Sequence, residues 1–234
     1  MTPWDAPIAP WPNLVCVRTD EAATQEILTG GERQLWEGMG RAVPKRRQEW
    51  LMGRAAGKRA VALLARRRGL EVNEAEVEIL KDEEGKPVVA APLGTVVSIA
   101  HAGGAAAAIA AFEPLSVGLD FEPLQRDITR FARTAFAEEE RRCLEGLGAR
   151  PVWALRLWCA KEAAGKALGR GLFTLLRGLC VVGVSTDGWV EMEVRGRMLA
   201  EFPQWEGRRL KAYSGQDDRL AFATAVIGDR SVAP

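Results

Sequence analysis

Three acidic side chains and a lysine stand at spacings that could build one chemical site. Asp120 and Glu122 are two residues apart in the strand-like run VGLDFEP, so both carboxylates should project from the same face of a sheet. Further along the chain, Glu162 lies in a segment with helical periodicity, and Lys166 follows one turn later on the same face. Three carboxylates suit a hard cation such as Mg²⁺, which shares its ligand shell with substrate phosphates.

The helix that carries Glu162 and Lys166 is apolar on both faces, which is typical of a buried helix. Ionised groups on such a helix are costly unless they are paired or bound to a metal, so the pattern indicates a site. Two plainer interpretations stay open. Asp120 and Glu122 could end a strand in solvent, and Glu162 with Lys166 could be an ordinary surface pair at i, i+4.

Two long helices and several shorter ones are predicted to position these side chains. Pro44 opens a long helix that runs to about Arg68, with Gly69 as its C-terminal cap. The second long helix runs from Pro151 to about Leu168. Shorter helices are predicted at 20–29, with Asp20 as the N-cap, and at 32–39.

Short apolar runs separated by turn residues predict strands in both halves of the chain. The alanine-rich run 105–112 could be helical by propensity, but the Gly103-Gly104 pair before it favours a hairpin with the run 95–101. An α+β fold is therefore expected. The four strand candidates of the second half should form an antiparallel sheet. They are 179–184, 189–194, 208–214 and 220–227. The first half has two further candidates, 14–18 and 77–80.

The long helix of the first half carries an unusual run of basic residues. From 41 to 68 there are ten Lys and Arg against a single acid, Glu49. Arg46, Arg54 and Lys58 are eight and four residues apart and can project along one side, as an anionic ligand requires. A solvated basic face is the alternative interpretation.

Composition indicates an ordinary globular protein. The chain has 234 residues, 47% hydrophobic and 27% charged, and its net charge of +1 argues against a dedicated nucleic-acid binder. The four cysteines show no metal-ligand spacing, which favours free thiols in a reducing compartment. The N-terminal residues lack the pattern of a signal peptide, and no window is apolar enough to span a membrane. We therefore expect a cytoplasmic enzyme.

The run VGLDFE and the later run W-x-x-K-E-A-x-x-K-x-x-G-x-G-L together resemble the paired signature of the 4′-phosphopantetheinyl transferases, specifically the longer surfactin-synthetase-activator (Sfp) type. Those enzymes move the phosphopantetheine arm of coenzyme A onto a serine of a carrier protein. The resemblance implies that Asp120, Glu122 and Glu162 bind Mg²⁺, with Mn²⁺ as a substitute. It also implies that Lys161 and Lys166 contact coenzyme A, and that Glu162 and Lys166 are catalytic.

The first half carries further parts of this resemblance. EWLMGRAAGKRA is similar to the first motif of the family, whose basic residues meet the phosphates of coenzyme A, and this implies that role for Arg46, Arg54 and Lys58. A Gly-Lys-Pro sequence at a turn is usually only a turn. Because the same G-K-P recurs in the family near the bound coenzyme, Lys86 is a candidate phosphate contact.

His101 is the only histidine in the chain. A lone histidine is usually structural, but this one stands at the position of the family's S-H-S sequence and is therefore a candidate coenzyme A contact. Ala100 and Ala102 replace the two serines of that pattern. Any hydroxyl contact to the coenzyme at these positions is lost.

The resemblance also implies an organisation and a reaction. The family fold has two pseudo-symmetric α+β halves, here 1–116 and 117–234, each with a long helix on an antiparallel sheet and with the active site in the cleft between them. Mg²⁺ would bind the pyrophosphate of coenzyme A, Glu162 would help deprotonate the carrier serine, and Lys166 would stabilise or protonate the leaving 3′,5′-ADP. The expected partner is an apo acyl, peptidyl or aryl carrier protein. We expect a monomer that binds neither nucleic acid nor membrane.

Two other functions remain open from the sequence. A different Mg²⁺-dependent phosphotransferase or nuclease could use a D-x-E pair with a lysine and would need no carrier protein. A non-catalytic relative could bind coenzyme A or the carrier without turnover, and Ala100 and Ala102 keep this alternative open.

Overall fold

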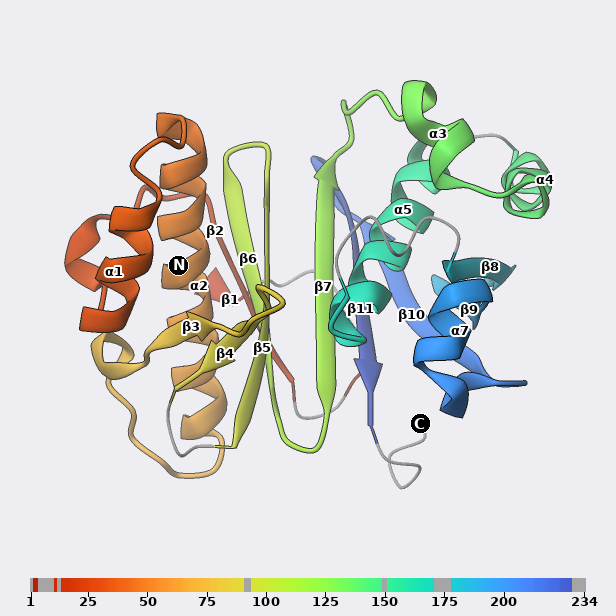
Figure 1. Cartoon of the computed structure of the whole chain (residues 1–234). Coiled ribbons are helices and arrows are strands. Elements are labelled where there is room, and N and C mark those ends of the chain that lie inside the picture. The colour runs from red at the N-terminus through yellow and green to blue at the C-terminus, as the bar shows by residue number, and fades with distance from the viewer. Residues whose placement is uncertain are drawn as a thin grey trace. The chain divides into compact units, whose positions relative to one another are not determined.

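The computed structural model describes residues 2–3, 11, 14–90, 94–148, 151–170 and 178–228, whose element order is drawn in Figure 1. The end of the second motif, at 171–172, lies outside these residues. Contacts divide the chain into two compact units, of which the first consists mainly of Trp11–Val117 and the second mainly of Gly118–Ile227. The boundary predicted between 116 and 117 lies at the start of strand β7 (Ser116–Pro123).

The first unit packs one long helix on an antiparallel sheet, as Figure 1 shows. Helix α2 (Pro44–Arg66) has proline at its start, and Gly69 follows its end with φ of 73°, so the predicted helix is confirmed. The sheet has the strand order β1-β2-β6-β5. Its strands are β1 (Thr2–Pro3), β2 (Val15–Thr19), β5 (Thr95–Ala102) and β6 (Ala105–Phe112).

The alanine-rich run forms a strand, which confirms the predicted hairpin. Strand β6 pairs antiparallel with β5 on one side and β2 on the other, and all of its residues are buried. Gly103 and Gly104 both have positive φ, which the tight connection to β5 requires. Tertiary pairing thus overrides the helix propensity of alanine.

The helix predicted for 20–29 is wrong, because this stretch contains only the 3₁₀ turn η1 (Gln25–Ile27). Thr29 rather than Asp20 acts as the N-cap, and it forms a capping box with Glu32. Helix α1 (Gly30–Gly38) therefore starts there and agrees with the helix predicted at 32–39. A short turn, η2 (Glu74–Glu76), and a hairpin of β3 (Ile79–Lys81) and β4 (Pro87–Val89) complete the first unit.

Two glycines let the strands of the first unit lie close against α2. A Cβ atom on Gly53 would stand 2.9 Å from Ile99 Cγ2, and one on Gly57 would stand 2.6 Å from Ile79 Cδ1. Both distances are shorter than the van der Waals contact distance between carbon atoms. The glycines of the first motif therefore bring β5 and β3 against the helix beside Arg54.

The second unit repeats this arrangement with helix α5 (Pro151–Ala167) on a sheet of order β7-β11-β10-β9-β8. The predicted antiparallel pairing of the last four strands is confirmed. These strands are β8 (Leu179–Val184), β9 (Trp189–Val194), β10 (Arg209–Gln216) and β11 (Leu220–Ile227). Shorter elements are α3 (Thr129–Ala135), α4 (Glu138–Gly146), α7 (Gly196–Glu201) and the turn η3 (Pro203–Trp205).

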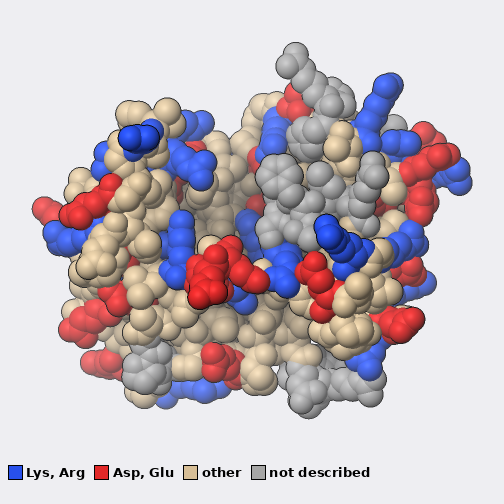
Figure 2. Space-filling view, viewed as in Figure 1, with Lys and Arg blue, Asp and Glu red and all other residues tan. Residues whose placement is uncertain are grey.

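Each unit has its own apolar core, centred on the contact between its long helix and its sheet. The predicted α+β class, with a long helix on an antiparallel sheet in each half, is therefore confirmed. Acidic and basic side chains are mixed over the face seen in Figure 2, in keeping with the small net charge. No helix within the described part of the chain is long and apolar enough to cross a membrane.

Candidate functional site

Strand β7 and helix α5 of the second unit approach each other unusually closely at Gly118. A Cβ atom there would stand 1.8 Å from the carbonyl oxygen of Ala163 and 2.8 Å from the amide nitrogen of Ala167. No side chain fits, so glycine is required for this contact. The sequence analysis did not single out Gly118, although it directly precedes the acidic strand end. The contact brings the carboxylates of β7 against the helix that carries Glu162.

Lys166 binds the carboxylate of Asp120 inside this contact. Its Nζ donates to Asp120 Oδ1 at 2.8 Å and to the backbone carbonyl of Leu119 at 2.9 Å. Asp120 is 9% exposed, whereas the side chain of Lys166 keeps 30% of its surface in solvent. The lysine can therefore reach a ligand while it stays close to the carboxylate.

Glu162 is a second buried carboxylate of the same site and is 7% exposed. Burial and, to a smaller extent, the negative charge of Asp120 together raise the pKa of Glu162 from 4.5 to about 7, against the opposing effects of Lys166, Arg126 and Lys161. The two carboxylates are thus electrostatically coupled. Their environment disfavours two negative charges unless a cation joins them.

Each of these two carboxylates also has an oxygen without a donor. Asp120 Oδ2 and Glu162 Oε1 are buried, and neither finds a hydrogen-bond partner among the described residues. Unsatisfied buried oxygens are rare and call for an explanation. Because carboxylate oxygens are the preferred ligands of Mg²⁺, this pair fits a bound divalent cation.

The third predicted metal ligand, Glu122, is paired with Arg126 at i, i+4 across the end of β7. In the part of the chain that the structure describes, no cluster of three or more His, Cys, Asp or Glu side chains suits a metal ion. Asp120 and Glu162 thus interact electrostatically with each other, whereas Glu122 forms an ion pair with Arg126. Sequence reasoning missed Arg126, although its spacing of four residues from Glu122 was a usable signal.

Lys161 is buried inside the second unit, and its role as a coenzyme A contact stays a prediction. It is 1% exposed, and its Nζ donates to the carbonyl of Ala135 at 2.8 Å and to both oxygens of Glu140 at 3.0 Å. Glu140 in turn accepts from the backbone N–H groups of Ala137 and Val181. Lys161 therefore ties α5 to α4 and β8.

In the first unit, Arg54 is the predicted phosphate contact whose surroundings most favour the binding of an anion. It is 3% exposed and its guanidinium lies over the ring of Trp50, 4.5 Å from the centroid. Its Nε and Nη2 atoms are buried and have no hydrogen-bond partner among the described residues. Burial lowers the pKa of Arg54 to about 10, and the charge of Glu32 only partly offsets this.

Lys58 is buried as well, and its contact with the ligand stays a prediction. Its Nζ lies 2.7 Å from Glu32 Oε2 and donates to the carbonyl of Val77. Its partners are internal to the unit, so it serves the fold.

Arg46 and Lys81 add positive charge beside Arg54. Arg46 is exposed at the start of α2, and Lys81 is exposed at the end of β3. Although Lys81 is exposed, partial desolvation lowers its pKa, and so do the charges of Arg54 and Arg46, which indicates that the three cations lie near one another. The sequence analysis missed Lys81, whose signal is its place directly after the strand at 77–80.

Lys86 and His101 remain predictions as ligand contacts. Lys86 is half-buried in the turn between β3 and β4, where its backbone N–H donates to Asp82 Oδ1 at 2.8 Å. The His101 side chain is 43% exposed, and its Nδ1 lies 3.6 Å from Glu49 Oε2. Next to it, Ala100 is buried and Ala102 is half-buried.

Comparisons with known proteins agree with this arrangement. Residues 116–225 match the family model described as 4′-phosphopantetheinyl transferase superfamily, and residues 32–111 match the model of the 4′-phosphopantetheinyl transferase N-terminal domain. No curated protein is similar enough in sequence to count as a match.

Among solved structures, the chain is similar to holo-[acyl-carrier-protein] synthase from Neisseria meningitidis, with 23% sequence identity and a TM-score of 0.40. The similarity covers 47% of this chain and 95% of that one. The two family matches lie in separate units and together span most of the residues, which shows that the chain belongs to the 4′-phosphopantetheinyl transferase superfamily.

Proposed function

We propose that this protein transfers the 4′-phosphopantetheine arm of coenzyme A to a serine hydroxyl of an apo carrier protein, as an enzyme of the longer surfactin-synthetase-activator type. One observation carries the proposal. Asp120 and Glu162 are buried, electrostatically coupled and each left with an unsatisfied oxygen beside Lys166. Such a set is expensive for folding alone and is suited to a cation and the phosphates that accompany it.

Asp120 and Glu162 would hold the Mg²⁺, and Glu122 would join them once Arg126 releases it. When bound, Mg²⁺ neutralises charge on the pyrophosphate of coenzyme A as the phosphoanhydride bond breaks. The basic residues of the first unit would bind the negative charge of the coenzyme. These are Arg46, Arg54 and Lys81, with Lys86 and His101 as further candidates.

In the proposed reaction, the serine oxygen forms a bond to the β-phosphorus while the bond from that phosphorus to 3′,5′-ADP breaks. The serine proton passes to Glu162, directly or through a water molecule. Lys166 would stabilise the negative charge of the leaving 3′,5′-ADP, and its ammonium group lies beside Asp120.

The test is direct. The protein is incubated with Mg²⁺, coenzyme A and apo acyl, peptidyl or aryl carrier proteins, and each carrier is weighed by mass spectrometry. A carrier that gains the phosphopantetheine arm supports the proposal. Asp120→Ala and Glu162→Gln should abolish the gain, whereas Glu145→Gln, at an exposed position of α4, should not. Full activity of either site variant contradicts the assigned roles.

A second candidate function is a relative that binds coenzyme A without turnover. The pairing of Glu122 with Arg126 and the alanines on both sides of His101 favour it. Calorimetry that detects binding of coenzyme A, together with no mass gain on any carrier, would support this alternative. Transfer to one carrier eliminates it.

A further inference from the structure

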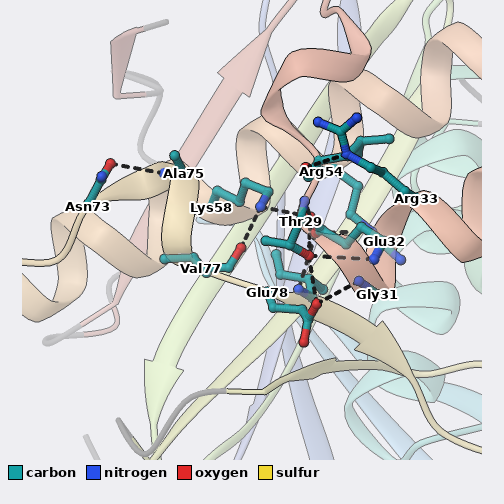
Figure 3. A network of polar contacts seen from close by, with 12 residues as sticks. Thr29, Gly31, Glu32, Arg33, Arg54, Lys58, Asn73, Ala75, Val77 and Glu78 are labelled. Carbon is teal, nitrogen blue, oxygen red and sulfur yellow. Dashed lines mark hydrogen bonds and ion pairs between the residues drawn. The ribbon is translucent and has the colours of Figure 1, made fainter.

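The buried network between α1, α2 and β3 centres on Glu32, as Figure 3 shows. Glu32 is 0% exposed. Its Oε2 accepts the backbone N–H of Thr29 at 2.9 Å and lies 2.7 Å from Lys58 Nζ, and its Oε1 accepts the backbone N–H of Ile79 at 3.1 Å. Both oxygens of the Glu32 carboxylate therefore have hydrogen-bond donors other than Arg54.

Arg54 stands beside this network without a hydrogen bond to it. Its Nε is 3.8 Å from Glu32 Oε1, beyond hydrogen-bond distance. Its Nε and Nη2 are buried and unpartnered among the described residues. Stacking on Trp50 and attraction to Glu32 hold the guanidinium in place, so two of its donor groups are not used by the fold.

Among the almost fully buried groups around Glu32, cations outnumber acids. Two cations, Arg54 and Lys58, are almost fully buried next to one fully buried acid. The nearby Glu78 is half-buried and accepts from Thr29 Oγ1 at 2.7 Å and from the N–H of Gly31 at 3.0 Å. The Nζ of Lys58 lies 2.7 Å from a Glu32 oxygen, whereas the Nε of Arg54 lies 3.8 Å from one. Lys58 therefore forms the stronger ion pair with the carboxylate. Arg54 keeps positive charge that is only partly compensated.

We propose that Lys58 is a positioning residue, which occupies Glu32 and thereby keeps the guanidinium of Arg54 available to a phosphate group of the bound ligand. Without Lys58, the carboxylate would turn to Arg54, because an unpaired buried acid is costly and a second cation stands within reach. An arginine locked in that pair would bind phosphate poorly. The identity of the phosphate ligand, coenzyme A, rests on the proposed function.

A double-mutant cycle tests this inference, with coenzyme A binding measured by calorimetry. Lys58→Met should weaken binding about tenfold or more, as expected when a hydrogen bond to a charged group is lost. Adding Glu32→Gln to that variant removes the competing acid and should restore affinity to within about threefold of the wild type. A purely structural role predicts the reverse, because the double variant would then bind no better than the single one.

Arg54→Met shows whether the effect passes through the arginine. It should weaken coenzyme A binding, and Lys58→Met should have no further effect in its presence. Arg59→Met and Glu74→Gln are the matched controls, because they remove the cation and the acid of a half-buried ion pair between α2 and the turn η2. Neither control should change affinity.

The remaining outcomes distinguish a failure of the inference from a failure of the proposed function. If Lys58→Met does not fold, Glu32→Gln alone should bind at least as tightly as the wild type, and a tenfold loss overturns the inference. If Arg54→Met binds coenzyme A normally, the inference is wrong while the proposed function survives. If the wild type does not bind coenzyme A, the proposed function fails, and the cycle is repeated with inorganic pyrophosphate. Absence of pyrophosphate binding then overturns the inference as well.

Discussion

Glu162 should destabilise the metal-free protein at neutral pH, and this cost can be measured. Its pKa is about 7 in the folded chain, against an ordinary value of 4.5. The unfolded chain loses the proton above pH 4.5, but the folded chain retains it until about pH 7. Folding stability therefore falls as pH rises through this window and the loss is complete above it. A shift of this size corresponds to about 3 kcal/mol.

Glu162→Gln keeps the shape of the side chain and removes the charge. Near pH 4.5 the folded wild type carries a neutral Glu162, so the variant and the wild type should have similar free energies of unfolding. At pH 8 the variant should be more stable by up to about 3 kcal/mol. The measurement is urea unfolding, followed by tryptophan fluorescence in buffers that contain EDTA. Glu145→Gln is the control, because this acid is exposed and its removal should leave the pH profile unchanged.

The same variant separates the buried charge from the cation. At pH 8, Mg²⁺ should raise the melting temperature of the wild type, since a ligand that binds only the folded state stabilises it. Glu162→Gln should show little of this effect. A stability difference that stays constant from pH 5 to pH 8 would refute the reasoning, because it would mean that Glu162 does not titrate in this window.

Three further substitutions test other parts of the structure. Gly118→Ala places a methyl group 1.8 Å from the carbonyl of Ala163, so urea unfolding should show a loss of at least about 3 kcal/mol. Lys161→Met leaves Glu140 buried without its cation and should cost about 3–5 kcal/mol, and an unchanged urea midpoint would contradict the structural role. Lys81→Met should raise the KM for coenzyme A by up to about fivefold with little change in kcat, and the effect should shrink at high salt.

Periodicity and turn chemistry were sufficient to predict most of the fold. Proline at the start and glycine after the end gave the bounds of α2, and a glycine pair revealed the β5-β6 hairpin. The helix predicted from Asp20 failed because two residues compete as caps in this stretch. Thr29 has a glutamate three residues later and forms the capping box. The sequence carries this signal, because Glu32 stands three residues after Thr29.

The candidate site was predictable in its residue types and only partly in its contacts. Asp120, Glu162 and Lys166 lie together because their spacing on one strand and one helix places them on facing surfaces. The roles of Lys58 and Lys161 depend on acids far away in the sequence. Helical spacing shows which residues share a face, but it does not show what packs against that face.

These two lysines, both assigned to the ligand from the sequence, instead occupy equivalent places in the two units. Each pairs with a fully buried glutamate, Glu32 or Glu140. Each glutamate is the third residue of a short helix and accepts the N–H of that helix's N-cap residue. Each also accepts one strand N–H, from Ile79 in β3 or from residue 181 in β8. The same polar connection thus joins a short helix, a long helix and a strand twice, although no sequence repeat is visible.

The two connections differ in one respect that bears on function. Glu32 has a second buried cation, Arg54, at 3.8 Å, whereas both oxygens of Glu140 are within 3.0 Å of Lys161. Lys161 thus hydrogen-bonds both oxygens of its acid, whereas in the proposal Lys58 also determines whether an arginine is available to a ligand. Neutralising Glu140 and Lys161 together should change the unfolding free energy and leave coenzyme A affinity intact. Loss of both in that double variant would show that the two connections do not divide structure and binding in this way.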